Sequence, residues 1–358
     1  MVEAMISFFM RGFMLKELNH TFIVLIPKNS NAATVQQYRP ISPCNVLYKI
    51  ISKLLANRLK RVLYKIVSPW QTEFVPERII QENTFIAQEI MYEMRKKKGK
   101  SPWMGLKIDM EKAYDRLEWE FLHKVMKCFG FPEVWIQWVL QCITTPTFSI
   151  LINGAPYRFF KSKRGLREGD PLSPFLFVLA GEVLSRMIGR ASLNDRIKGV
   201  KLSRDSEPIT HLQFANDQFL FARARETDAD GIMECINLFS TWSRQKINLS
   251  KSVIMFSKNV SPLHKGLLAN ILGINAANRR EKYLGLPLVS GKEKRLALQE
   301  VIDKVNSHLQ GWKMKVLSQA AKGALIRSVS SSIPSYHMSS LLLPKSICKK
   351  LDCINRNF

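Results

Sequence analysis

Apolar residues recur along this chain with two periods, one typical of strands and one typical of helices. Residues 20–27 (HTFIVLIP) are apolar on both faces of an extended chain, which predicts a β-strand. Residues 45–67 instead place Ile and Leu at helical spacing and carry Lys and Arg on the opposite face. This second pattern predicts an amphipathic helix, which ends where Ser68 precedes Pro69.

The same criteria predict the remaining elements. Turn residues indicate two β-hairpins, 148–160 around Asn153-Gly154 and 209–224 around a tip of Ala215, Asn216 and Asp217. A short strand is predicted at 103–110. Helices are predicted at 81–98, 115–129 and 227–245 and over most of the C-terminal third. Another helix is predicted to begin near residue 173, with Ser173 as its N-cap and Pro174 as its first helical residue. Strands interleaved with helices favour an α+β fold.

The chain is strongly basic. Its 358 residues include 54 Lys and Arg against 29 Asp and Glu, a formal net charge of +25. The basic residues are dispersed rather than gathered in a tail, which favours a long basic channel for a polyanion. Nucleic acid is the polyanion we expect, because neutralising phosphates releases counterions. A basic protein without such a partner is the alternative.

Other features exclude several classes of protein. The cysteines lie far apart, mostly among apolar residues, which indicates reduced thiols, and Cys348 and Cys353 lack the spacing of zinc ligands. The first residues are not a signal peptide, because Glu3 and Arg11 interrupt its basic and apolar parts. No stretch approaches the ~20 apolar residues of a membrane span. We therefore expect an intracellular protein with no membrane partner.

Three short segments carry residues suited to nucleotidyl transfer. That reaction uses two divalent cations held by carboxylates, so an Asp that ends a strand should face another Asp on a tight hairpin. Asp109 ends the predicted strand, and Asn216-Asp217 form a hairpin tip. The glycine-rich loop 164–174 (RGLREGDPLSP) enters a helix and is suited to seat a nucleotide or a template backbone.

Each of these segments also has a plain structural interpretation. Asp109 can serve as a helix cap or turn residue, and Asn and Asp are common turn formers. The loop 164–174 can be an ordinary helix entry. The order and spacing of the three segments together are more specific than any one of them.

A series of ordered motifs makes the chain similar to a known family. The motifs fall at 19–28, 38–63, 71–90, 106–122, 165–184, 211–224, 247–257, 282–288, 311–329 and 333–344. They resemble the reverse transcriptase of LINE-type non-LTR retrotransposons, of the kind abundant in plant genomes, from about Phe8 to the C-terminus. The resemblance implies a right-hand polymerase fold, with an antiparallel sheet and helices in the palm.

The resemblance also implies a division into domains. Residues 1–103 would form an N-terminal extension and the fingers. Residues 104–285 would form the palm with the catalytic motifs, and part of 116–165 would return to the fingers. Residues 286–358 would form a partial, truncated helical thumb. The chain begins inside the element, so we expect neither an endonuclease domain before it nor an RNase H domain after it.

Roles for single residues follow from the same resemblance. Asp109 and Asp217 would bind Mg²⁺, assisted by the Met110 carbonyl, and Lys251 would give a proton to pyrophosphate. Tyr114 would exclude a ribose 2′-OH, although core packing is its alternative role. The implied partners are an RNA template, a DNA primer and dNTPs. The nucleotide-binding positions are Lys28, Arg39, Tyr114, Glu168 and Gly169, and the primer grip is Tyr283, Leu284 and Gly285.

This sequence departs from the family at several positions. Asn216 replaces an Asp of the catalytic hairpin, Glu168 replaces a Gln, and Glu77 and Arg244 each replace a Gly. Asn keeps the shape of Asp but removes a full negative charge between two dications. Each ~1.4 kcal/mol of transition-state stabilisation that is lost lowers the rate tenfold. We expect a drop in activity of roughly two or more orders of magnitude.

Three hypotheses therefore compete. The first is an active RNA-directed DNA polymerase. The second is a catalytically dead fold that binds nucleic acid, either as a degenerate copy or as a domesticated binder. The third is a translated relic without a cellular role.

Overall fold

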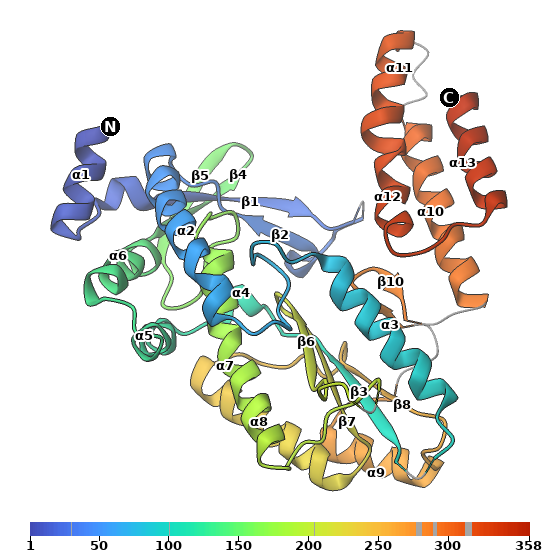
Figure 1. Cartoon of the computed structure of the whole chain (residues 1–358). Helices are drawn as coiled ribbons and strands as arrows, with labels where there is room; N and C mark the ends of the chain where they lie inside the picture. Colours follow the sequence, from blue (N-terminus) through green and yellow to red (C-terminus); the bar gives the residue numbers. More distant parts are fainter. Residues whose placement is uncertain (30, 100, 204, 277–280, 289–291, 312–316) are drawn as a thin grey trace.

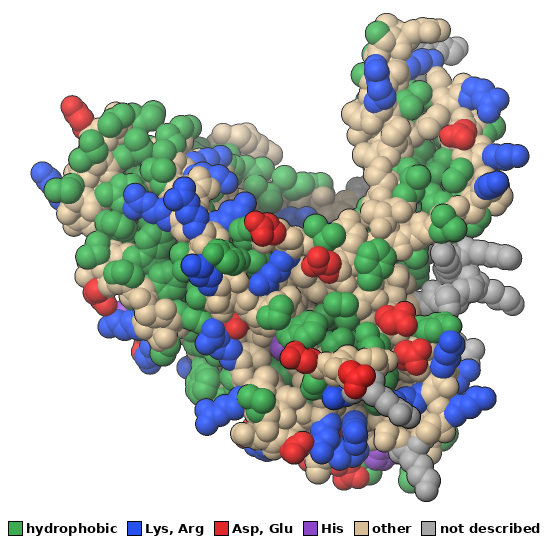
Figure 2. Space-filling view, in the orientation of Figure 1, with side chains coloured by type: hydrophobic (Ala, Val, Ile, Leu, Met, Phe, Trp, Pro, Cys, Tyr) green, Lys and Arg blue, Asp and Glu red, His purple; other side chains and the backbone are tan. Residues whose placement is uncertain are grey.

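The computed structural model describes residues 1–358 except 30, 100, 204, 277–280, 289–291 and 312–316. Figure 1 shows two sheets with their helices and, apart from them, a bundle of helices at the C-terminal end. Figure 2 shows a wide hollow between the N-terminal part and this bundle, with Lys and Arg side chains scattered over the visible face. No described helix has the length and apolar character needed to cross a membrane.

The palm sheet has four described strands, and each neighbouring pair is antiparallel. The predicted strand at 103–110 and the hairpin at 209–224 are confirmed, and the two pair with each other. The strand order is β6 (His211–Phe214), β7 (Asp217–Arg223), β3 (Trp103–Ile108), β8 (Val253–Phe256).

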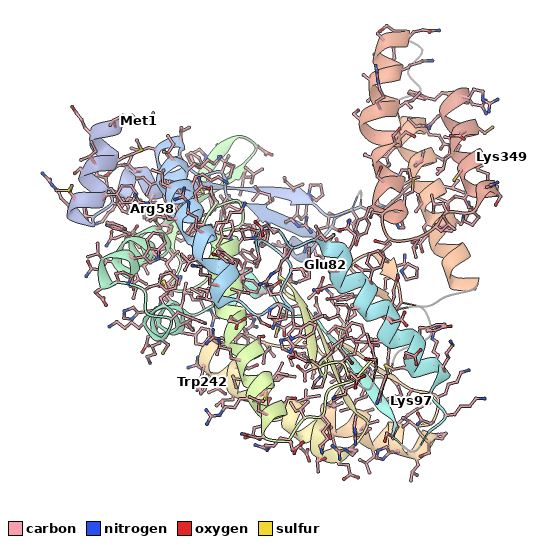
Figure 3. The ribbon with its side chains drawn as sticks, in the orientation of Figure 1. Met1, Arg58, Glu82, Lys97, Trp242 and Lys349 are labelled. Atoms are coloured by element: carbon pink, nitrogen blue, oxygen red, sulfur yellow. The ribbon has the colours of Figure 1, made fainter. Side chains whose placement is uncertain are left out.

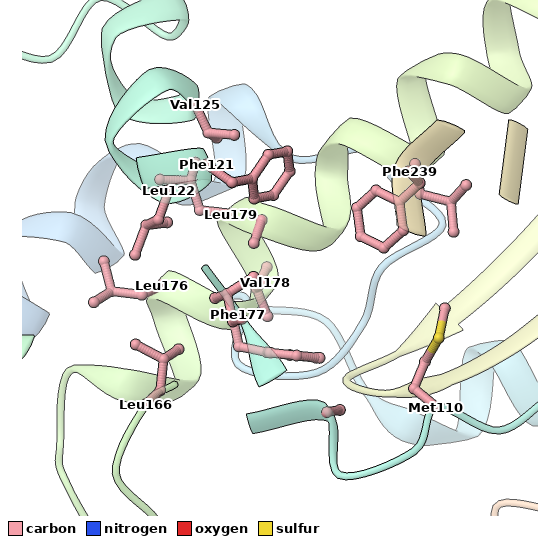
Figure 4. Close-up of a cluster of buried hydrophobic side chains, with 14 of the residues drawn as sticks. Met110, Phe121, Leu122, Val125, Leu166, Leu176, Phe177, Val178, Leu179 and Phe239 are labelled. Atoms are coloured by element: carbon pink, nitrogen blue, oxygen red, sulfur yellow. The ribbon is translucent and has the colours of Figure 1, made fainter. Parts of the chain in front are cut away.

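Helices bury both faces of the palm sheet. Leu106 and Ile108 of β3 share a core with α7 (Ser173–Leu193) and α8 (Glu226–Ser243). Figure 4 shows part of this core, where the rings of Phe121 and Phe239 approach each other. Phe219 and Phe221 of β7 point the other way and share a second core with α3 (Ile80–Lys96). The alternation of strand side chains between the two faces therefore fixes which side each residue takes.

The fingers sheet also has four described strands. Its central pair, β1 with β4, is parallel, and the outer pairs are antiparallel. Asn153 and Gly154 form the predicted tight turn, with φ of 50° and 81°. The hairpin 148–160 and the strand 20–27 are thereby confirmed. The strand order is β2 (Tyr38–Ile41), β1 (His20–Pro27), β4 (Thr147–Ile152), β5 (Ala155–Lys161).

Several predicted helices are confirmed near their expected bounds, and the C-terminal third is helical. Asn45 caps α2 by accepting a hydrogen bond from the Leu47 amide at 2.9 Å. Residues 312–316 of the motif at 311–329 lie outside the described residues. Further helices are α1 (Val2–Arg11), α2 (Val46–Ile66), α6 (Glu133–Thr144), α9 (Pro262–Leu272), α10 (Lys292–Gly311), α11 (Gln319–Leu325), η3 (Ile326–Ser330), α12 (Ser332–Met338) and α13 (Lys345–Asn357).

The helix predicted at 115–129 is wrong in one respect, because the chain forms two helices. These are α4 (Ala113–Arg116) and α5 (Trp119–Cys128), with Leu117 in an extended conformation between them. The break frees backbone carbonyls for the glycine-rich loop. Gly165 N donates to Leu117 O, and Leu166 N donates to Tyr114 O, both at 2.8 Å. Helix α7 also begins one residue earlier than predicted, at Ser173.

Gly165 is the position where this attachment depends on glycine. Its φ is +91°, and a Cβ atom there would lie 2.8 Å from Asp115 O. We predict that Gly165→Ala lowers the free energy of unfolding by about 1–3 kcal/mol, from backbone strain and overpacking. Urea denaturation measures this. Gly189→Ala, in α7 with open space around it, is the control and should be neutral or stabilising. Equal stability of the two variants would contradict the prediction.

Candidate active site

The two predicted catalytic carboxylates lie on adjacent strands. Ile108 of β3 pairs with Gln218 of β7, so the next residues, Asp109 and Asp217, face each other across the antiparallel pair. A turn after α8 holds Asp109 in place from the other side. Asp109 N donates to Ser252 Oγ at 3.1 Å, and Asn248 N donates to Asp109 O at 2.8 Å. Both side chains are partly buried.

The tip of the catalytic hairpin is fixed by a segment that precedes α3. Ala215 takes a left-handed conformation with φ of 48°, and Asn216 follows it at the tip. Ala215 N donates to Gln71 Oε1 at 3.3 Å, and Gln71 forms a parallel bridge with Gln213 of β6. The hairpin therefore folds with Asn at position 216, as the sequence predicts.

The electrostatics of this pair suit a bound cation. Burial raises the pKa of Asp217, and the negative charge of Asp109 raises it further, while the positive charge of Lys107 lowers it. Lys107 is itself engaged elsewhere. Its Nζ donates to Lys282 O at 2.7 Å and lies 3.8 Å from Glu281 Oε2. Asp109 and Asp217 face each other, and the nearby Lys107 ammonium is bonded elsewhere. A divalent cation would therefore be stabilised between the two carboxylates.

Glu73 is an acidic residue at this site that the sequence analysis missed. Burial raises its pKa to about 7, with a further contribution from the charge of Asp217. Its Oε2 atom is buried without a hydrogen-bond partner among the described residues. Glu73 N donates to Gln71 Oε1 at 3.1 Å, which keeps the residue beside the hairpin. Nothing in the local pattern of residues 71–80 sets this acid apart, so only the fold brings it here.

The glycine-rich loop carries the predicted nucleotide-binding residues to the fingers. Glu168 O accepts a hydrogen bond from Ser42 N at 3.3 Å, and Gly169, with φ of +98°, passes close to Ser42. Burial raises the pKa of Glu168, whereas the positive charges of Arg39 and Lys28 lower it. The structure therefore brings the two fingers cations and Glu168 within electrostatic range of one another.

Tyr114 forms part of the wall between this loop and the carboxylates. Its ring stacks on Phe177, with centroids 4.9 Å apart and an interplanar angle of 12°. Burial raises the pKa of its hydroxyl, and the charges of Glu73 and Glu168 raise it further. Tyr114 thus packs on the core and also borders the site, so both roles considered for it are compatible with its position.

Met110 and Lys251 are the two remaining residues to which the resemblance assigns a role at the metal site. Met110 pairs with Ile247 in a bridge whose hydrogen bonds come from the flanking residues, so its own carbonyl points away from Ile247. Lys251 lies in the turn next to Ser252, and its side chain is exposed. No contact between the Lys251 ammonium and Asp109 is found among the described residues.

The predicted primer grip is a two-stranded hairpin of β9 (Lys282–Tyr283) and β10 (Leu286–Pro287). Leu284 and Gly285 form its turn, both with positive φ. Tyr283 is fully buried, with its ring centroid 5.2 Å from that of Phe219, so it anchors the hairpin to the palm core. The Tyr336 hydroxyl of α12 donates to Leu284 O and ties the turn to the C-terminal helices.

The candidate metal ligands among the described residues are two carboxylates and one amide. Within the part of the chain that the structure describes, no group of three or more His, Cys, Asp or Glu is arranged to hold a metal ion. Asp109 and Asp217 supply two carboxylates, and Asn216 offers only a neutral amide oxygen. These residues fit a divalent cation held more weakly than three carboxylates would hold it.

The family follows from this geometry and from comparison with known proteins. The family model described as reverse transcriptase (RNA-dependent DNA polymerase) matches residues 26–288. The chain belongs to the reverse transcriptase family. Its right-hand polymerase fold agrees with a telomerase structure from Candida tropicalis, which has a TM-score of 0.53 at 12% identity and covers 94% of this chain and 57% of that one.

Several relatives of this reverse transcriptase are proteins of retrotransposable elements. The transposon TX1 149 kDa protein of Xenopus laevis is 26% identical over 328 residues, 90% of this chain and 24% of that protein. The Pol polyprotein of the type-2 retrotransposable element R2DM of Drosophila melanogaster is 30% identical over 203 residues, 56% of this chain and 18% of that protein. The chain thus spans about a quarter or less of the length of these two relatives.

The raised pKa of Glu73 gives a test of this site without any ligand. The folded chain holds a proton on Glu73 up to about pH 7, while the ordinary pKa is 4.5, so the free energy of unfolding falls as the pH rises between these values. We predict that Glu73→Gln stabilises the protein at pH 8 and has little effect at pH 4, measured by urea denaturation. Glu89→Gln, exposed on α3, is the control. An equal effect of Glu73→Gln at both pH values would contradict the assignment.

Proposed function

We propose that this chain is the polymerase domain of a retroelement Pol protein. In its intact form it would extend a DNA primer along an RNA template with dNTPs and Mg²⁺ inside the cell. The observation that supports this most directly is the pairing that sets Asp109 opposite Asp217 on adjacent strands. A bound divalent cation supplies charge stabilisation to the attacking and leaving oxygens of the transfer.

The chain's own residues would bind and orient the substrates. Lys28 and Arg39 would bind the triphosphate from the fingers, because Arg suits bidentate contact with phosphate. Glu168 lies within electrostatic range of the same cations, so a triphosphate would compete with its carboxylate. Tyr114 would close the sugar side of the pocket, and Lys251 would act as proton donor to the pyrophosphate.

The same geometry leads us to propose that catalysis is impaired. Asn216 keeps the hairpin intact but leaves two carboxylates where the resemblance implies three. Part of the charge stabilisation, worth several kcal/mol, is therefore missing. The chain would hold its substrates in a folded site and turn them over slowly.

Restoring the carboxylate tests this directly. We predict that Asn216→Asp raises the rate of primer extension on an RNA template by roughly 100-fold or more, because a dication regains a charged ligand. Single-turnover extension with Mg²⁺ measures the rate. Asn216→Ala serves as the size control and should be no faster than the unchanged protein. If the unchanged protein already extends as fast as Asn216→Asp, the impairment is refuted.

A second candidate function is nucleic-acid binding without catalysis. It is favoured by the net charge of +25, together with the missing charge at Asn216. Such binding would use the basic residues and would not need the metal site.

We predict that the affinity for RNA falls steeply with salt, because each neutralised phosphate releases counterions. A titration from low to moderate salt, measured by fluorescence anisotropy, should give a linear fall of log affinity with log salt. Asp109→Asn, which removes a metal ligand but no basic residue, should show the same slope. A flat response would exclude a phosphate-driven interface.

A further inference from the structure

A second hollow lies among the helices that support the palm sheet, away from the catalytic residues. It is a cavity of about 750 Å³ between α5, α7 and α8. None of the catalytic, nucleotide-binding or primer-grip residues lines it. Its volume falls within the range of protein binding pockets, roughly 300–1,000 Å³. Its large apolar lining residues are Phe121, Val125, Phe129, Val183, Met187 and Trp242.

Large apolar groups of this groove remain accessible. Trp242 is 49% exposed, on the last turn of α8, and Figure 3 shows it at the edge of the palm near α7. Phe129 and Met187 are partly buried, and the Arg186 guanidinium lies over the Phe129 ring, 4.6 Å from its centroid. By contrast, Phe121 is 8% exposed and packs against Phe239 of the core. The groove therefore has a rigid apolar base and an exposed indole at its rim.

The charged rim of the groove is net positive, and its acids are already paired. Glu120 Oε1 lies 2.8 Å from Lys124 Nζ, and Glu118 Oε1 lies 3.7 Å from Arg164 Nη1. Two further rim cations, Arg190 and Arg244, are exposed and have no acidic partner among the described residues. A ligand with acidic groups would therefore meet two uncompensated guanidinium groups, which suit bidentate contact with carboxylates.

The backbone of Arg244 is strained. It caps α8 in the left-handed conformation, with φ of 59° and ψ of 13°. Glycine adopts this conformation without strain, whereas a long side chain there is an outlier that costs on the order of 1 kcal/mol. Arg244 is thus both a backbone outlier and one of the two unpaired cations at the rim of the groove.

We propose that this groove docks an acidic amphipathic helix from a partner protein. The apolar face of such a helix would cover Phe129, Met187 and Trp242, and its acidic face would meet Arg190 and Arg244. A helix suits the surface because helices form its walls and no strand borders it. Charge complementarity selects an acidic partner over a basic one. The proposal does not depend on the polymerase activity, since no catalytic residue lines the groove.

A labelled peptide tests the proposal on the full chain. The probe is a synthetic helix of about 18 residues, five turns, with Leu and Phe on one face and Glu on the other. Fluorescence anisotropy measures its binding, and the emission of Trp242, with Trp242→Phe as the blank, reports whether it occupies the groove. We expect the double variant that combines Arg190→Glu and Arg244→Glu to bind the peptide at least about tenfold more weakly.

Two variants separate a loss of binding from a loss of folding. Arg244→Gly relieves the left-handed strain, so it should keep or raise the stability and still weaken binding several-fold. Lys349→Glu, on the C-terminal bundle in Figure 3, makes a single charge reversal elsewhere and should leave binding unchanged. If Arg244→Gly binds the peptide as well as the unchanged chain, the proposed role of Arg244 is refuted.

Competing occupants give distinct results. A peptide with Lys in place of Glu should bind at least about tenfold more weakly, and equal binding would mean a non-selective apolar surface. Single-stranded RNA should leave the peptide bound. Displacement of the peptide by RNA, lost in the double arginine variant, would assign the groove to nucleic acid instead. Absence of peptide binding, with Trp242 emission unchanged, would overturn the docking site.

Discussion

The pairing register between β3 and β7 decides whether the catalytic site exists. Ile108 lies opposite Gln218, so Asp109, which follows Ile108, lies opposite Asp217, which precedes Gln218. A shift of one residue would send Phe219 and Phe221 to the opposite face, because side chains alternate along a strand. Those rings pack into the core under α3, while Leu106 and Ile108 pack under α7 and α8. Burial on both faces therefore maintains the register on which the carboxylate pair depends.

The same pairing makes the site costly before any cation arrives. Asp217 carries a pKa raised by burial and by Asp109, and Glu73 adds a third acid near it. An aspartate at position 216 would add yet another charge to this group. The neutral amide of Asn216 adds no such charge, so the metal-free fold carries less repulsion here than it would with an aspartate. In our proposal the same change weakens the attraction for a dication, so stability and catalysis would make opposite demands on this position.

Sequence patterns predicted the elements with strong periodicity and the parts of the site that follow an ordered motif. The strand at 20–27, both hairpins and the positions of Asp109 and Asp217 follow from alternation, turn residues and spacing. Contacts between distant segments could not be predicted in this way. Helical periodicity continues across the break between α4 and α5, where Leu117 O accepts a hydrogen bond from Gly165 N, 48 residues away. Glu73 likewise depends on distant contacts of Gln71, which bridges Gln213 and accepts a hydrogen bond from Glu73 N.

The four positions at which the resemblance implies another residue fall in two different physical settings. Asn216 and Glu168 lie in the candidate site, where a change of charge alters the electrostatics and hardly affects the packing of the core. Glu77 and Arg244 instead take left-handed conformations, with φ of 66° and 59°, so each adds strain to an exposed turn. Neither group enters the two cores of the palm sheet. Because the cores are separate from these positions, the fold accommodates all four residues without a change in its packing.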